Sequence, residues 1–198
     1  TTITIANTNR VPVITAPATA SGSENTPLTF NVSATDADGD PVALSMLTGA
    51  PLGATFTDNG NNTGTFNWTP NFTQAGSHTV NFRGNDGNGG IGDASTSITV
   101  NDVNGAPTAN PGGPYTGVVE VSVNLNGTGS SDPDGDTLTF AWDFGDGGTA
   151  SSPAPSHIYL SAAGSPYTVS LRVTDNGTPN LSNTASTTAT ISDVFTAM

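Results

Sequence analysis

Short segments in which apolar and polar residues alternate recur along the whole chain. Clear examples are the TVNF segment at 79–82 and the YTVSLRV segment at 167–173. A period of two puts apolar side chains on one face of a β-strand and polar side chains on the other. Long stretches with a helical period are absent, and turn residues separate the segments. The pattern predicts an all-β protein.

The predicted strands fall into two sets. The first set is 28–34, 42–47, 55–58, 64–68, 76–84 and 94–100, and the second is 119–126, 137–144, 156–159, 165–174 and 184–192. Several short strands within about 100 residues, separated by turns, are typical of a β-sandwich. Each set is therefore predicted to form one sandwich.

Two phrases repeat at nearly the same offset. The ITIANTNRVP segment at 3–12 aligns with ITVNDVNGAP at 98–107, and a partial copy, TISDV, follows at 190–194. The DADGD segment at 36–40 returns as DPDGD at 132–136. Two independent phrases at nearly the same offset indicate two similar modules, each ending in a strand that runs into a polar connector stopped by Pro.

These repeats define the expected domain organisation. Residues 10–102 are predicted to form module one, and residues 103–198 module two. Residues 1–9 are predicted to be the last strand and linker of a preceding repeat, or a donor strand that pairs with the open sheet of another subunit. The chain is expected to be an excerpt of a longer polypeptide.

Module two resembles a PKD (polycystic kidney disease) domain. The motifs that carry the resemblance, in family order, are GGPY at 112–115, SSDPDGD at 130–136, LTFAWDFGDG at 138–147, PSHIY at 155–159 and YTVSLRVTD at 167–175. Residues 161–163 are an insertion before Gly164, which is expected only to lengthen a loop.

Module one is similar to bacterial immunoglobulin-like and cadherin-like repeats. Its motifs are ENTPL at 24–28, DADGD at 36–40, GTFNWTP at 64–70, QAG at 74–76 and NDGNGG at 85–90. The two resemblances imply tandem antiparallel immunoglobulin-like β-sandwiches joined by a short linker and displayed outside the cell. The linker, NDVNGAP at 101–107, resembles the calcium-binding linker of cadherins, with Gly105 where a second acidic residue is usual.

The charge of the chain restricts its partners. Asp and Glu number 16 against three Arg and no Lys, and the net charge is −13. Such a surface lacks the basic footprint needed for nucleic acid and is repelled by anionic lipid, so neither partner is expected. A hard cation, calcium above all, suits clustered carboxylates. The chain has no Cys, which excludes disulfides and thiolate metal sites.

Acidic residues cluster in two predicted cation sites. In a sandwich, the loops after the second and sixth strands and the incoming linker share one end. The site at the junction of the modules is predicted to comprise Asn101, Asp102, Asn104, Asp132, Asp134, Asp136 and Asp175, with Glu24 approaching from module one. The equivalent site of module one is Asp36, Asp38, Asp40 and Asp86, completed by Asn7 and Asn9. The alternative is that both Asp-Gly-Asp phrases are polar turns capped by their own side chains.

Catalysis is not expected. Trp142 alternates with Phe140 and Phe144, so the three side chains lie on one face of the predicted strand, and Trp142 is interpreted as a core residue. The alternative is an aromatic platform for sugars, which needs several exposed rings. His157 is interpreted as a hydrogen-bonded wall residue, and no nucleophile elbow, paired catalytic acids or phosphate loop is present. The chain is therefore predicted not to be an enzyme.

The functional hypothesis is a pair of structural or adhesive spacer modules in a large secreted or cell-surface protein, such as a stalk, surface layer, adhesin or filament, with calcium as the stiffening ion. The alternative is a non-catalytic accessory region of a secreted enzyme that degrades polysaccharide or protein. Expected partners are neighbouring repeats of the same polypeptide, other copies of the chain, and surface polysaccharide or protein, with no direct membrane insertion.

Overall fold

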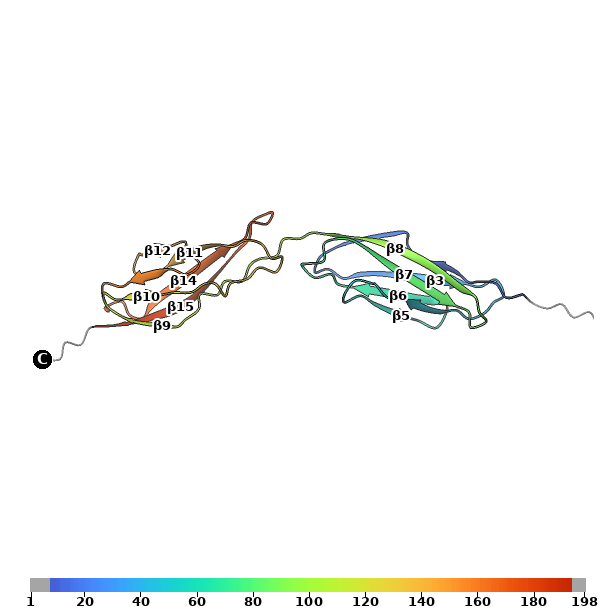
Figure 1. Cartoon of the computed structure of the whole chain (residues 1–198), viewed down its shortest axis with the longest axis horizontal. Helices are drawn as coiled ribbons and strands as arrows, with labels where there is room; N and C mark the ends of the chain where they lie inside the picture. The colour runs from blue at the N-terminus through green and yellow to red at the C-terminus, as the bar shows by residue number, and fades with distance from the viewer. Residues whose placement is uncertain (1–7, 194–198) are drawn as a thin grey trace, which may run out of the picture. The chain divides into compact units, whose positions relative to one another are not determined.

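The computed structural model describes residues 8–193, which form two compact units. Module one extends to Val103 and module two begins at Asn104. Every regular element in the described residues is a β-strand (Figure 1), so they include no helix that could cross a membrane. The predicted fold class, two tandem β-sandwiches, is confirmed. The predicted donor strand lies largely outside the described residues.

Module one is built from two four-stranded sheets in its described part. Their orders are β1-β3-β6-β5 and β2-β8-β7-β4. The strands are β1 (Val13–Thr15), β2 (Thr19–Ser23), β3 (Leu28–Thr35), β4 (Ala43–Met46), β5 (Thr55–Asp58), β6 (Thr63–Trp68), β7 (Gly76–Asn85) and β8 (Ile91–Asn101).

The core of module one lies between these sheets. Val32, Phe66, Val80, Phe82 and Ile98 are fully buried, because the alternation of each strand directs them inward. The Phe66 and Phe82 rings meet edge to face, with centroids 6.2 Å apart. This geometry suits the aromatic quadrupole and adds to the stabilisation from apolar burial.

Module two has a larger and a smaller sheet. Their orders are β12-β11-β14-β15-β9 and β10-β13. The strands are β9 (Tyr115–Val118), β10 (Ser122–Asn124), β11 (Thr139–Asp143), β12 (Thr149–Ala150), β13 (Ser156–Ile158), β14 (Tyr167–Thr174) and β15 (Ser182–Ser192). Trp142, Tyr159, Val169, Leu171 and Val173 are at most 2% exposed and form the centre of its core.

In its described residues, each module contains one parallel strand pair within otherwise antiparallel sheets. In module one β2 pairs with β8, and in module two β9 pairs with β15. An early strand thus runs alongside the last strand and covers its edge, which would otherwise be open to unwanted pairing. In module one this register brings Glu24 next to Asn101, and the Glu24 N–H donates to the Asn101 carbonyl at 3.2 Å.

The predicted strands agree with the observed ones most closely in module one, where 55–58 is β5 without change. The prediction of one strand at 119–126 is wrong. Glu120 has a φ of 60°, and the Val121 N–H bonds to the Val118 carbonyl, so the chain turns between β9 and β10. The sequence pattern also missed β1, β2, β9 and β12, which are short and lack a clear apolar alternation.

Candidate functional site

The acidic loop of module one is a turn closed by its first side chain. Asp36 Oδ1 accepts hydrogen bonds from the backbone N–H of Asp38 at 2.8 Å and of Asp40 at 3.3 Å. Gly39, between these two, has a φ of 84°, a left-handed conformation that glycine adopts at little cost. The self-capped turn that the sequence offered as an alternative is therefore present.

Module two repeats both capping bonds and the left-handed glycine of this loop. Asp132 Oδ1 accepts from the N–H of Asp134 at 2.9 Å and of Asp136 at 3.2 Å, and Gly135 has a φ of 80°. Capping uses one oxygen of the leading carboxylate. The other oxygen of that carboxylate takes no part in the capping.

In module one the acidic loop and the next acidic turn hold the incoming chain. The Arg10 N–H donates to Asp38 Oδ2 at 2.7 Å, and the Arg10 guanidinium lies 3.4 Å from Asp38 Oδ1. One residue earlier, Asn9 Nδ2 donates to Asp86 Oδ2 at 2.8 Å. We call this pair of backbone and side-chain bonds the connector clamp.

Module two has an equivalent connector clamp. The Gly105 N–H donates to Asp134 Oδ2 at 2.7 Å, and Asn104 Nδ2 donates to Asp175 Oδ2 at 3.2 Å. The clamps differ in charge, because Gly105 stands where module one has Arg10. Asp134 therefore receives a backbone N–H but no guanidinium from the connector.

Three carboxylate oxygens in these loops are buried without a hydrogen-bond partner. They are Asp36 Oδ2, Asp132 Oδ2 and Asp134 Oδ1. In module one a carboxylate oxygen from each of the three loop aspartates lies within 4.8 Å of the others. A buried carboxylate oxygen without a donor is costly, and a hard cation would satisfy it. The donor set of module one therefore fits calcium by the proximity of its carboxylates. In module two the support is the two carboxylate oxygens without a partner, against one in module one.

Each module has a buried aspartate in its next acidic turn, Asp86 in module one and Asp175 in module two. Both accept hydrogen bonds from protein donors. The Asn9 hydrogen bond lowers the pKa of Asp86; burial opposes this, and the N–H groups of Asn88 and Gly90 lower the pKa further. Asp175, 2% exposed, accepts backbone N–H bonds from Gly177 and Leu181. Both side chains therefore anchor their own loops as well as the connector.

Glu24 acts as a structural anchor within module one. It is 2% exposed, and its two oxygens accept the N–H groups of Gln74 at 3.2 Å and Val103 at 3.1 Å. Asn101 ends β8 and Asp102 is exposed. The expectation that these groups share one cation with the acidic loop of module two stays a prediction.

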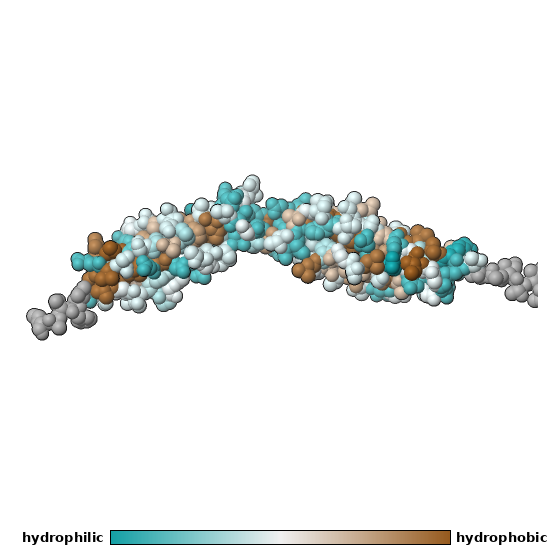
Figure 2. Space-filling view, viewed as in Figure 1, coloured by the Kyte–Doolittle hydropathy of each residue, from teal (hydrophilic) through white to brown (hydrophobic). Residues whose placement is uncertain are grey.

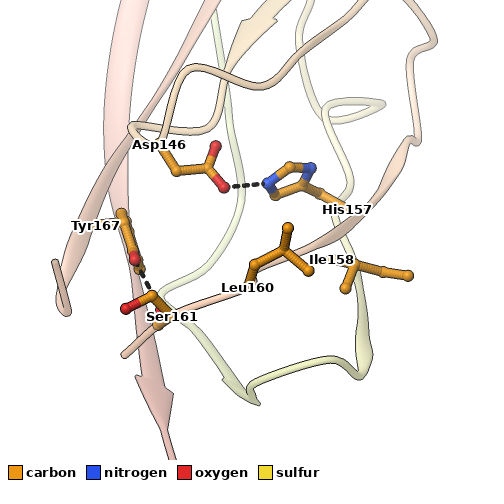
Figure 3. A pocket seen from close by; sticks show the side chains of 6 residues that line it. All are labelled: Asp146, His157, Ile158, Leu160, Ser161 and Tyr167. Carbon is orange, nitrogen blue, oxygen red and sulfur yellow. Dashed lines mark hydrogen bonds and ion pairs between the residues drawn. The ribbon is translucent and has the colours of Figure 1, made fainter. Parts of the chain in front are cut away.

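Module two also contains an aspartate–histidine pair that sequence reasoning did not connect. His157 Nε2 lies 2.7 Å from Asp146 Oδ2, and the side chains are 17% and 21% exposed (Figure 3). The imidazole stacks on Phe144 with ring centroids 4.1 Å apart and meets Tyr159 edge to face. The prediction that His157 is a hydrogen-bonded wall residue is confirmed, but its partner could not be read from spacing alone.

The electrostatics of this pair favour an ionised carboxylate. Burial alone would raise the pKa of Asp146, but the hydrogen bonds from His157 and the Gly148 N–H hold it below its usual value. Burial raises the pKa of the neighbouring Tyr159 to about 12, and the charge of Asp146 adds to this shift. Asp146 is therefore an ionised carboxylate in a partly buried setting.

Both tryptophans are core residues. Trp68 and Trp142 are each 2% exposed, and their indole N–H groups donate to the carbonyls of Leu52 at 3.2 Å and Ser152 at 3.0 Å. The large hydrophobic side chains exposed in the described residues are all aliphatic. The described surface therefore lacks the aromatic platform on which sugar rings stack.

Two family models divide the chain between them. The model described as "PKD domain" matches residues 104–191, and that described as "Bacterial Ig domain" matches residues 9–101. The two ranges together take in nearly all of the described residues.

Individual relatives match one module or the fold. Collagenase ColQ1 of Bacillus cereus (strain Q1) is 36% identical over 90 residues, 46% of this chain and 9% of that protein. The microbial collagenase of Vibrio alginolyticus is 40% identical over 89 residues, 45% of this chain and 10% of that protein. The chain thus matches about a tenth of either collagenase. Mouse cadherin-23 EC22-24 is similar in fold, with a TM-score of 0.52, 19% identity, and coverage of 93% of this chain and 65% of that one.

Proposed function

Since residues 104–191 are a PKD domain and residues 9–101 are a bacterial immunoglobulin domain, we propose that the chain is a non-catalytic accessory region of a larger secreted enzyme that acts on a polymer. Two relatives at 36% and 40% identity are collagenases, and the matched lengths, 90 and 89 residues, are those of one module. These relatives favour a protein polymer over a polysaccharide. The fold alone would not decide this, because such sandwiches serve many functions.

The observation that carries the mechanical part of the proposal is the repeated connector clamp. In each module a carboxylate of the acidic loop holds the backbone N–H of the incoming connector at 2.7 Å. Hydrogen bonds to a charged acceptor are stronger than neutral ones. A clamped connector limits the freedom with which a module turns about the segment before it. The modules accordingly serve as stiff spacers as well as polymer contacts.

Calcium is the ion proposed to complete the clamp of module two. Asp132, Asp134, Asp136 and Asp175, with Asn104, would hold it through oxygen ligands of the kind that this hard cation prefers. In module one the Arg10 guanidinium already partly balances Asp38, so calcium dependence should be weaker there. An ion that binds only the folded module stabilises it by mass action.

The second candidate is a spacer in a stalk, adhesin or filament without any enzyme. The connector clamp supports it equally, because stiffness is useful in either setting. Both candidates place the chain outside the cell or on its surface, where polymer substrates and partner modules are found. A catalytic domain elsewhere in the complete polypeptide would decide for the accessory region.

Co-sedimentation of the purified chain with insoluble polymers tests the accessory function. The chain is mixed with fibrillar collagen, with chitin, or with glass beads as the matched inert support, and the protein left in solution is measured. We expect selective loss from solution with collagen. Equal retention in solution on all three supports would contradict polymer binding and leave the spacer function.

A further inference from the structure

A pocket opens beside the aspartate–histidine pair of module two. Its volume is about 460 Å³, and it is lined by Asp146, His157, Ile158, Leu160, Ser161 and Tyr167 (Figure 3). The lining residues come from the turn after β11, from β13 and the segment that follows it, and from the start of β14. The connector clamp of this module involves none of them.

One side of the pocket is aliphatic. Leu160 is 80% exposed and Ile158 47% exposed, and Val121, 56% exposed, precedes Ser122, the residue that pairs with Ile158. Figure 2 shows an apolar area at the end of module two where β9 and β15 finish. An apolar cluster that remains open to water beside a pocket marks a contact surface better than a single exposed side chain does.

The other side of the pocket carries acceptor atoms with unused capacity. Asp146 Oδ1 accepts the Gly148 N–H at 3.0 Å and Oδ2 meets His157 Nε2 at 2.7 Å, so each oxygen has one partner where a carboxylate oxygen accommodates about two. The Tyr167 hydroxyl donates to the Ser161 carbonyl at 2.7 Å, which leaves its oxygen able to accept.

Apart from His157, the described residues of module two supply no cation to this carboxylate. The chain has no Lys, and the guanidinium of Arg172, the arginine of module two, donates to Ser182 Oγ at 3.0 and 3.2 Å. The net charge of −13 also draws basic partners toward the whole surface. An ionised, partly buried acid next to an aliphatic wall is therefore complementary to a cation on an apolar stem.

We infer that this pocket binds a lysine side chain of a polypeptide partner. The methylene stem lies against Leu160 and Ile158, and the ammonium group donates to Asp146 and to the Tyr167 oxygen. A lysine buries its stem and keeps a strong donor at the tip, which is the pattern that the pocket offers. The inference deepens the accessory function, on which it rests, by committing the polymer to a polypeptide with basic side chains.

Titration of the whole chain with capped peptides, followed by nuclear magnetic resonance, tests the inference. The probe is a Gly-Lys-Gly-Lys-Gly peptide, compared with peptides in which norleucine or Nε-acetyl-lysine replaces lysine. We expect shifts of the His157 ring and Leu160 methyl signals. Affinity should be about tenfold lower for both analogues, because norleucine loses the hydrogen bond to the charged acceptor and Nε-acetyl-lysine loses the positive charge.

Two variants separate charge from shape, and each has a matched control. Asp146→Asn should weaken lysine-peptide binding about tenfold by removing the charge, whereas Asp143→Asn, at an exposed aspartate of the same turn, should not. Leu160→Ser should weaken it about threefold by removing the apolar wall, whereas Leu52→Ser, at a similarly exposed leucine of module one, should not.

Equal affinity for the lysine and norleucine peptides would overturn the inference, as would absence of shifts at His157 and Leu160. Tighter binding of a chitosan oligomer than of the lysine peptide would assign the pocket to an amino-sugar polymer instead and so reject it. Collagen binding that Asp146→Asn and Leu160→Ser leave unchanged would preserve the accessory function while rejecting this pocket as its contact. Binding of the lysine peptide without binding of collagen would preserve this pocket as a lysine site and reject the accessory function.

Discussion

The carboxylate of Asp134 accepts a 2.7 Å hydrogen bond from the backbone N–H of Gly105, 29 positions earlier in the chain. Asp38 and Arg10 form the same bond at the same length in module one. An acidic loop that looks like a simple turn in sequence therefore has a second task. It fixes the place at which the chain enters each sandwich.

Asp134→Ala should loosen the connector of module two. Loss of a charged acceptor should cost about 1–3 kcal/mol and leave the Gly105 N–H without its partner. Amide hydrogen exchange at Gly105 should become faster. Asp143→Ala is the control, because Asp143 is exposed and caps only its own turn, through the Gly145 N–H at 2.9 Å. Unchanged exchange at Gly105 in Asp134→Ala would contradict the clamp.

Calcium should raise the melting temperature of module two. Calorimetry in millimolar calcium and in chelator should give different midpoints for the wild-type chain, by mass action. Asp132→Asn should abolish the difference, since the amide oxygen still caps the turn but the charge is gone. Asp36→Asn is the matched change in module one, where Arg10 already faces Asp38, and should leave the shift intact. Superimposed wild-type curves would show that calcium does not bind.

Trp142→Ala should destabilise module two by about 3–5 kcal/mol. The ring is 2% exposed and packs near Phe144, with centroids 6.5 Å apart, so its removal leaves a cavity. Chemical denaturation measures the change in the free energy of unfolding. Leu52→Ala, at a residue 84% exposed, should change it by less than about 0.5 kcal/mol. A Trp142 variant as stable as wild type would mean that the ring is not part of the core.

Asp86 should make module one sensitive to acid. Its folded pKa is lowered from 3.8, so its stabilising contribution is present above that value and is lost as the pH falls through the lowered pKa. Asn9→Ala removes the bond that lowers the pKa most and should move the folded pKa upward. Carbon resonances of the carboxyl group, followed during an acid titration, measure it. An Asp86 pKa that is the same in wild type and Asn9→Ala would refute the assigned cause.

Local patterns predicted the longest strands, and they offered the self-capped turns as one of two interpretations of the acidic loops. The alternation at 79–82 and 167–173 lies within β7 and β14, because the period of two is a property of the strand itself. Asp36 caps the N–H groups of residues only two and four positions away. Such short-range bonds depend on turn chemistry, which is visible in the sequence.

The repeated phrases predicted two modules, and the topology of a β-sandwich predicted that the acidic loops share one end of each. Neither predicted the contacts made there. Glu24 binds the Val103 N–H across 79 positions, and Asn104 binds Asp175 across 71. Which carboxylate receives which connector N–H depends on how strands far apart in sequence are placed. No residue type or spacing specifies that placement.

The sequence by itself determined that this protein is two β-sandwich modules with acidic turns, because periodicity, turn residues and repeats are local properties of the chain. Only the tertiary structure decided that Asp38 and Asp134 clamp the connectors, that Glu24 is buried as an anchor, and that Asp146 meets His157 beside the aliphatic wall of Leu160. These contacts follow from strand register and sheet packing, which bring together groups whose interaction no single segment encodes.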